Sequence, residues 1–174
     1  MNELRETLPK LQAPEVLALN AYFEAAAEYA PFGSNALVGP MAVVLNRWQH
    51  PSDWQDSIQA VVAAHRQFSW TNWDTIKDPQ YPQALRLAKT LLAGNEVDSP
   101  IWLAAHDLAL AMLQGRASNP VGNSTFYYNP KACNPAWAKA LKEVAVIGHH
   151  RFMAAPRDPI VMWNPAVNYL EGGE

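Results

Sequence analysis

Proline and glycine divide this sequence into apolar segments of helical length, and this division constrains the fold more than any other feature. Residues 14–30 begin with a proline, which suits the first turn of a helix, and they are followed by Pro31 and Gly33. Apolar residues recur there at helical spacing, on a stripe of Val16, Asn20, Phe23, Ala27 and Ala30. The same punctuation predicts helices over residues 40–48, from a cap at Ser52 or Asp53 to Ala64, and over 81–93, 99–113 and 134–148.

Two irregular segments interrupt these helices. Residues 66–78 lose periodicity and predict a loop, whereas residues 118–134 are rich in Asn, Gly, Ser and Pro and predict a loop or a short β-hairpin. Long loops in a compact domain usually carry function. We therefore expect a mainly α chain with a leader over residues 1–13, a helical domain over 14–152 and an extended tail over 153–174.

Composition excludes several classes of protein. The length of 174 residues fits one domain, and a hydrophobic content of 49% with 17% charged residues argues against disorder. A net charge of −3 without a basic run gives no reason to expect nucleic acid, and no apolar run reaches the ~18 residues of a membrane span. The first residues do not resemble a signal peptide. Cys133 is the single cysteine and no histidine has ligand spacing, so we expect no disulfide, metal or cofactor.

Glu24 and Glu28 are the first candidates for chemistry. Four residues apart on a helix, they share one face, and Glu24 lies at the edge of the apolar stripe. Partial burial there raises the pKa of a carboxyl toward neutral pH, and Ala21, Ala25 and Ala27 leave room for a ligand. Spacing alone favours two solvated glutamates. If Glu24 is catalytic, it acts as a lone acid/base, because two carboxyls on one face cannot flank a scissile bond.

Several motifs occur in one order along the chain. They are Glu24-Ala25-Ala26-Ala27-Glu28, Val43-Val44-Leu45-Asn46-Arg47, Gln67-Phe68-Ser69-Trp70, Tyr127-Tyr128-Asn129-Pro130, Pro135-x-Trp137 and Ile147-Gly148-His149-His150-Arg151-Phe152. With this series the chain resembles the cell wall hydrolase family typified by the spore-cortex-lytic enzyme SleB. The resemblance extends from about residue 14 to 152 and implies that this range is the catalytic domain.

The resemblance implies a lysozyme-like helical fold that cleaves the glycan strands of peptidoglycan. Members act as lytic transglycosylases, and the family's catalytic acid/base corresponds to Glu24. The substrate-binding candidates are Glu28, Gln67, Ser69, Trp70, Tyr127, Tyr128, Asn129 and His150. A structural role stays open for Trp70, one of the tyrosines and His150, and Asn46-Arg47 is expected to hold helices together by buried hydrogen bonds. The seven Trp, six Tyr and five Phe suit a core, and they also suit sugar stacking.

Three departures from the family pattern bear on substrate preference. Ala26-Ala27 replace Arg-Gly, so a turn becomes continuing helix; the stretch from residue 28 to 43 is longer; and Asn119 stands where an aspartate is common.

The sequence further suggests a phage lysin, carried in the virion or made in the host cytoplasm with access to the cell wall, and a tail that docks to virion proteins. The alternatives are a hydrolytic muramidase or glucosaminidase, a zinc amidase, and a virion structural protein without catalysis.

Overall fold

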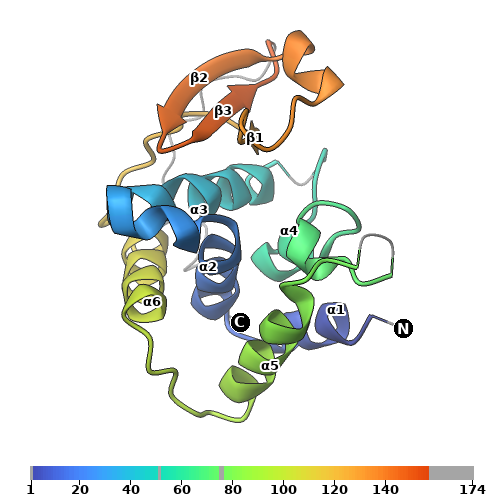
Figure 1. Cartoon of the computed structure of the whole chain (residues 1–174), viewed down its shortest axis with the longest axis vertical. Helices are drawn as coiled ribbons and strands as arrows, with labels where there is room; N and C mark the ends of the chain where they lie inside the picture. Colours follow the sequence, from blue (N-terminus) through green and yellow to red (C-terminus); the bar gives the residue numbers. More distant parts are fainter. Residues whose placement is uncertain (1, 51, 75–76, 157–174) are drawn as a thin grey trace.

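The computed structural model describes residues 2–50, 52–74 and 77–156, so most of the expected C-terminal tail lies outside the described residues. Within them the chain forms six α-helices and a small antiparallel sheet (Figure 1). The helices are α1 (Glu3–Thr7), α2 (Ala13–Phe32), α3 (Asn35–Trp48), α4 (Ile58–Ala63), α5 (Tyr81–Leu92) and α6 (Pro100–Leu113), with short 3-10 turns η1 (Leu8–Lys10), η2 (Ser69–Thr71) and η3 (Ala136–Ala140). The strands are β1 (Phe126–Tyr128), β2 (Lys142–Ile147) and β3 (His150–Ala154). The predicted mainly helical class is confirmed.

Helix α2 runs through the centre of the helical layer and packs mainly against α3 and α6 (Figure 1). It begins with a capping box between Gln12 and Glu15, and every residue from 16 to 21 is buried. Residues 16–21 cover all sides of the helix, so this part of α2 is surrounded by protein and the predicted stripe describes only part of its buried surface. Its last members, Ala27 and Ala30, are exposed.

Helix α3 begins at Asn35, five residues before the predicted start at Pro40. The proline lies inside the helix because the preceding turn buries Ala36, Leu37 and Val38, and this burial offsets the one backbone hydrogen bond that proline cannot donate. Gly39 lies against the ring of Phe152 on β3, where a Cβ would overlap the ring carbons. The helix and the sheet therefore meet at a glycine.

The predicted helix over residues 134–148 is wrong. Residues 136–140 form only η3, and β2 then pairs with β3 across the tight turn at Gly148 and His149. Gly148 has a φ of 58°, which suits such a turn, and β-branched Val144, Val146 and Ile147 favour the strand.

The irregular segment over residues 118–134 contributes only β1 to the sheet. Its partner is β3, far along the chain, and not a neighbouring strand in a local hairpin. The strand order is β1-β3-β2, and Figure 1 shows the sheet at one end of the molecule, beside α3.

The other helices follow the sequence more closely. α4 starts later than predicted, because Ser57, and not Ser52 or Asp53, caps it by accepting a hydrogen bond from the Ala60 N–H. α5 and α6 lie where predicted; Ser99 caps α6, and Gly94 follows α5 with a φ of 72°.

Residues 3–10, which the sequence assigned to a leader, form α1 and η1. Leu4 and Leu8 are fully buried in the main core and Leu11 nearly so, and α1 packs against α5. The Leu4 N–H donates to the Tyr81 hydroxyl on α5 over 3.2 Å. These residues are part of the domain's packing.

No helix in the described part of the chain has the length and apolar character needed to span a bilayer.

Candidate active site

Glu24 lies on α2, half-buried, at the wall of a cleft of about 470 Å³. The Tyr127 hydroxyl donates a hydrogen bond to its Oε2 over 2.8 Å. Burial raises the pKa of this carboxyl to about 7; the Tyr127 hydrogen bond and the charge of Arg47 lower it, and Asp78 raises it. Near neutral pH the group can therefore both donate and accept a proton.

Tyr127 reaches Glu24 from the middle of β1. Its backbone pairs with Phe152 on β3, and its ring stacks on that phenylalanine with centroids 5.5 Å apart. Burial and the Glu24 carboxyl raise the pKa of Tyr127 well above its usual value, so the phenol stays neutral and can donate. The close contact of Phe152 with Gly39 fixes this stack against α3.

Arg47, near the end of α3, supplies the positive charge beside Glu24. Its Nε donates to the Thr125 carbonyl over 2.8 Å, and its guanidinium carbon lies 4.4 Å from the centre of the Trp54 ring. Burial lowers the pKa of Arg47 to about 10, which leaves it protonated at neutral pH. Its Nη1 is buried without a hydrogen-bond partner among the described residues, although the side chain lines the cleft.

Asn46 and Arg47 make the buried hydrogen bonds that the sequence predicted, but these bonds reach the segment before β1 and not another helix. Asn46 Nδ2 donates to the carbonyls of Gly122 and Ser124 over 2.8 and 2.7 Å. Together with the bond from Arg47 to Thr125, these contacts attach the segment before β1 to α3 and so position Tyr127. Asn119, which stands where the family often has an aspartate, donates to Asn46 Oδ1 over 2.9 Å and supports this attachment.

The structure brings most of the predicted site residues together in this cleft. It is lined by Glu24, Arg47, Arg66, Gln67, Ser69, Asn72, Tyr127, Tyr128, Asn129, Ala132, Cys133, Pro135, Trp137 and His150. Among these lining residues Glu24 is the single carboxylic acid. The two irregular segments of the sequence therefore meet at the carboxyl of α2.

Two predicted substrate-binding residues lie elsewhere. Trp70 is fully buried and stacks on Phe23 with centroids 5.2 Å apart, so it anchors its loop in the core and cannot touch a ligand. Glu28 is 6% exposed and does not line the cleft. Its Oε2 accepts a hydrogen bond from the His149 N–H over 3.0 Å, and its Oε1 lies 3.3 Å from His150 Nδ1.

His150 contacts both Tyr127 and the cleft. Its ring contacts Tyr127 edge-to-face, with centroids 5.5 Å apart, and it also lines the cleft. Burial lowers its pKa, whereas Glu28 opposes this shift. Glu28 and His150 thus connect the β2–β3 turn to α2 directly behind Tyr127.

Sequence reasoning missed several lining residues, including Arg66, Asn72 and Trp137. Asn72 fixes the loop before α5, because its Oδ1 accepts from the Arg66 N–H and its Nδ2 donates to the Phe68 carbonyl. Only the irregular composition of residues 66–78 indicated this role. Trp137 belonged to a recognised motif, but the predicted helix obscured its orientation.

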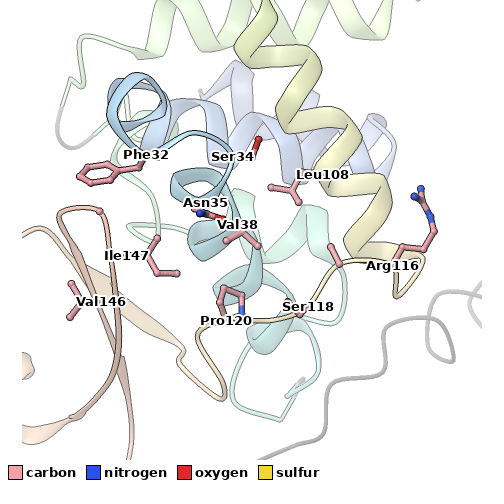
Figure 2. Close-up of a pocket in the computed structure, with 12 residues that line it drawn as sticks. Phe32, Ser34, Asn35, Val38, Leu108, Arg116, Ser118, Pro120, Val146 and Ile147 are labelled. Carbon is pink, nitrogen blue, oxygen red and sulfur yellow. The ribbon is translucent and has the colours of Figure 1, made fainter.

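Two further findings concern other parts of the surface. A larger pocket, about 680 Å³, is lined by Val146 and Ile147 of β2 together with Val38 of α3 and Leu108 of α6 (Figure 2). It contains none of the predicted site residues and no carboxylic acid. Within residues 2–50, 52–74 and 77–156, no three His, Cys, Asp or Glu side chains are grouped as metal ligands.

Comparison with known proteins identifies a family. The sequence model described as Cell Wall Hydrolase matches residues 34–153, which include the lining residues from Arg47 to His150 but begin after Glu24. No curated protein matches the chain at a significant level.

Two solved structures share the fold. The catalytic domain of the germination-specific lytic transglycosylase SleB from Bacillus anthracis superposes with a TM-score of 0.52 at 19% identity, covering 82% of this chain and 93% of that one. The catalytic domain of the Bacillus cereus SleB protein gives 0.52 at 20% identity, covering 82% and 91%. Since the family match spans most of the sequence, the chain belongs to the cell wall hydrolase family.

Proposed function

We propose that this chain cleaves the glycosidic bond between N-acetylmuramic acid and N-acetylglucosamine in peptidoglycan, as a lytic transglycosylase with Glu24 as its acid/base. Membership of the cell wall hydrolase family supports the substrate. The observation that carries the reaction is a single carboxyl in the cleft, half-buried, with a pKa of about 7. Such a group can serve as acid and then as base.

The two proton transfers use the same carboxyl. Protonated Glu24 gives its proton to the glycosidic oxygen, the bond from that oxygen to the muramoyl C1 breaks, and the N-acetylglucosamine leaves with a free hydroxyl. The Glu24 carboxylate then takes the proton of the muramoyl C6 hydroxyl as that oxygen bonds to C1. The product is a 1,6-anhydro ring, no water is consumed, and Glu24 is protonated again.

A hydrolytic mechanism with two carboxyls fits this cleft less well. Such enzymes place an acid and a base or nucleophile on the two sides of the scissile bond, ~5–9.5 Å apart. Glu28 shares the helix of Glu24 but binds the β2–β3 turn, and Asp78 influences the Glu24 pKa without lining the cleft. A substrate hydroxyl as nucleophile removes the need for a second carboxyl.

Tyr127 and Arg47 stabilise the negative charge that Glu24 carries after it has given up its proton. Both lower the pKa of Glu24 and therefore stabilise its carboxylate after the first proton transfer. Burial opposes them and keeps the carboxyl a competent acid. The balance between burial and these two partners sets the working pH.

The test compares wild-type protein, Glu24→Gln and Glu96→Gln on purified sacculi. Glu96 is an exposed glutamate in the loop between α5 and α6 and serves as the matched control. Because acid/base assistance contributes ~10²–10⁴-fold, Glu24→Gln should lower the rate of glycan release by at least about 100-fold, and Glu96→Gln should leave it unchanged. Circular dichroism checks that all three proteins are folded.

Two of the rivals give a different result in the same assay, and the end groups of the released products distinguish the hydrolytic one. A zinc amidase would lose activity in EDTA and release stem peptides, and a structural protein without catalysis would release nothing from wild type. Full activity in Glu24→Gln would overturn the assignment of the acid. A role of this protein in a phage virion, and the docking of residues 153–174 to virion proteins, stay predictions from the sequence.

A further inference from the structure

Trp137 is a large apolar side chain left open in the cleft of Glu24. It is 38% exposed and belongs to η3, between β1 and β2. Two neighbouring rings hold the indole: Tyr128 meets it edge-on with centroids 5.6 Å apart, and Phe126 lies tilted against it at 5.4 Å. The indole is thus fixed by aromatic neighbours while more than a third of its surface stays free.

The rest of the cleft supplies polar groups from other segments. Gln67, Ser69 and Arg66 come from the loop between α4 and α5, and Asn129 follows β1. An aromatic face together with amide, hydroxyl and guanidinium groups suits a pyranose, which has C–H bonds on its faces and hydroxyl or N-acetyl groups at its edge. An apolar peptide or a lipid would leave these polar groups without partners.

We propose that the Trp137 indole is a sugar-binding platform, on which a pyranose ring of the glycan stacks while a neighbouring glycosidic bond lies at Glu24. The proposal rests on the proposed function and adds a substrate-binding residue to it. Stacking removes apolar surface of both the indole and the sugar from water. Because the indole is already held by Tyr128 and Phe126, little side-chain freedom is lost on binding.

A second tryptophan provides a matched comparison. Trp73 is also 38% exposed, but its ring stacks on Tyr81 with centroids 5.2 Å apart, and Lys77 Nζ lies 4.9 Å from its centre. It does not line the cleft. Replacing Trp73 therefore removes an equally exposed indole from the molecule without touching the proposed platform.

The experiment measures binding separately from cleavage. In the Glu24→Gln background, calorimetry gives the Kd of a soluble tetrasaccharide of alternating N-acetylglucosamine and N-acetylmuramic acid for Trp137→Ala, Trp137→Phe and Trp73→Ala. We expect Trp137→Ala to weaken binding at least about tenfold, Trp137→Phe to weaken it less, and Trp73→Ala to leave it unchanged. An unchanged Kd in Trp137→Ala, or an equal loss in Trp73→Ala, would overturn the proposal.

Cys133 reports on the state of the same cleft. It is exposed, lines the cleft and is the single cysteine of the chain, so its alkylation can be followed directly. The first comparison is made without sugar. If Cys133 is alkylated at the same rate in Trp137→Phe as in the protein that keeps Trp137, the substitution leaves the cleft wall intact. Bound tetrasaccharide should slow alkylation when Trp137 is present, and Trp137→Ala should remove this protection.

Failure of the platform and failure of the proposed reaction give different results. Should wild type cleave nothing while the tetrasaccharide binds in a Trp137-dependent way, the reaction is wrong and the platform stands. Should wild type produce anhydro ends while Trp137→Ala and Trp137→Phe keep the wild-type KM, the platform is wrong and the reaction stands.

Discussion

The Glu24 carboxyl combines a raised pKa with a phenolic donor and a nearby guanidinium. As the acid of the first step it must be protonated, so activity should fall as the pH rises through about 7. Tyr127→Phe removes the hydrogen bond that stabilises the carboxylate, which raises the pKa of Glu24 further. The alkaline limb of the rate profile should move to higher pH.

The measurement is the initial rate of glycan release between pH 5 and pH 9, at a set ionic strength. Tyr128→Phe is the control, because Tyr128 also lines the cleft but does not bind Glu24. A limb that moves to lower pH in Tyr127→Phe, or that moves equally in both variants, would contradict the assigned role of Tyr127.

The sequence and its resemblance named Glu24 as a candidate but not the contacts that its carboxyl makes. Helical spacing placed the carboxyl at the edge of a buried surface, which is a local property of α2. Tyr127 and Arg47 reach it from β1 and α3, so their arrangement depends on contacts between segments about 80 residues apart, such as the bond from Arg47 to Thr125. The resemblance named Tyr127 as a candidate, but the hydrogen bond needed the fold.

At the scale of elements, Glu28 fastens the β2–β3 turn to α2. Glu28→Ala leaves the His149 N–H without its acceptor, and we expect a loss of about 1–3 kcal/mol in the free energy of unfolding. Glu28→Gln should lose less, since an amide oxygen can accept the same hydrogen bond. Urea denaturation at pH 7 measures both variants.

The comparison of the two variants separates hydrogen bonding from helix propensity. Alanine is the better helix former, so a loss in Glu28→Ala comes from the turn and not from α2. Equal stability of wild type and Glu28→Ala would contradict the docking role of this carboxyl.

Element boundaries could be predicted where a cap or a glycine decides them. Ser99 and Gly94 bound α6 and α5 as expected, because capping is local. The predicted helix start at Pro40 and the predicted helix over residues 134–148 are wrong because tertiary contacts determine the structure there. Burial of the preceding turn extends α3, and pairing with β3 makes residues 142–147 a strand.

At the scale of the whole molecule, residues 3–11 belong to the core that carries the site. Leu8 is fully buried, so Leu8→Ala should lower the free energy of unfolding by about 2–5 kcal/mol. Leu103→Ala is the control, because Leu103 on α6 is 54% exposed. Thermal denaturation followed by circular dichroism measures both variants. If Leu8→Ala were as stable as Leu103→Ala, residues 3–11 would not contribute to the core.

The central claim is that one carboxyl carries the whole reaction and that the nucleophile belongs to the substrate. Digestion of sacculi in ¹⁸O-labelled water, followed by mass spectrometry of the released muropeptides, tests it most directly. The account predicts 1,6-anhydro ends without ¹⁸O from wild type, and at least about 100-fold less product from Glu24→Gln. Reducing ends that carry one ¹⁸O atom would contradict it, because water would then be the nucleophile.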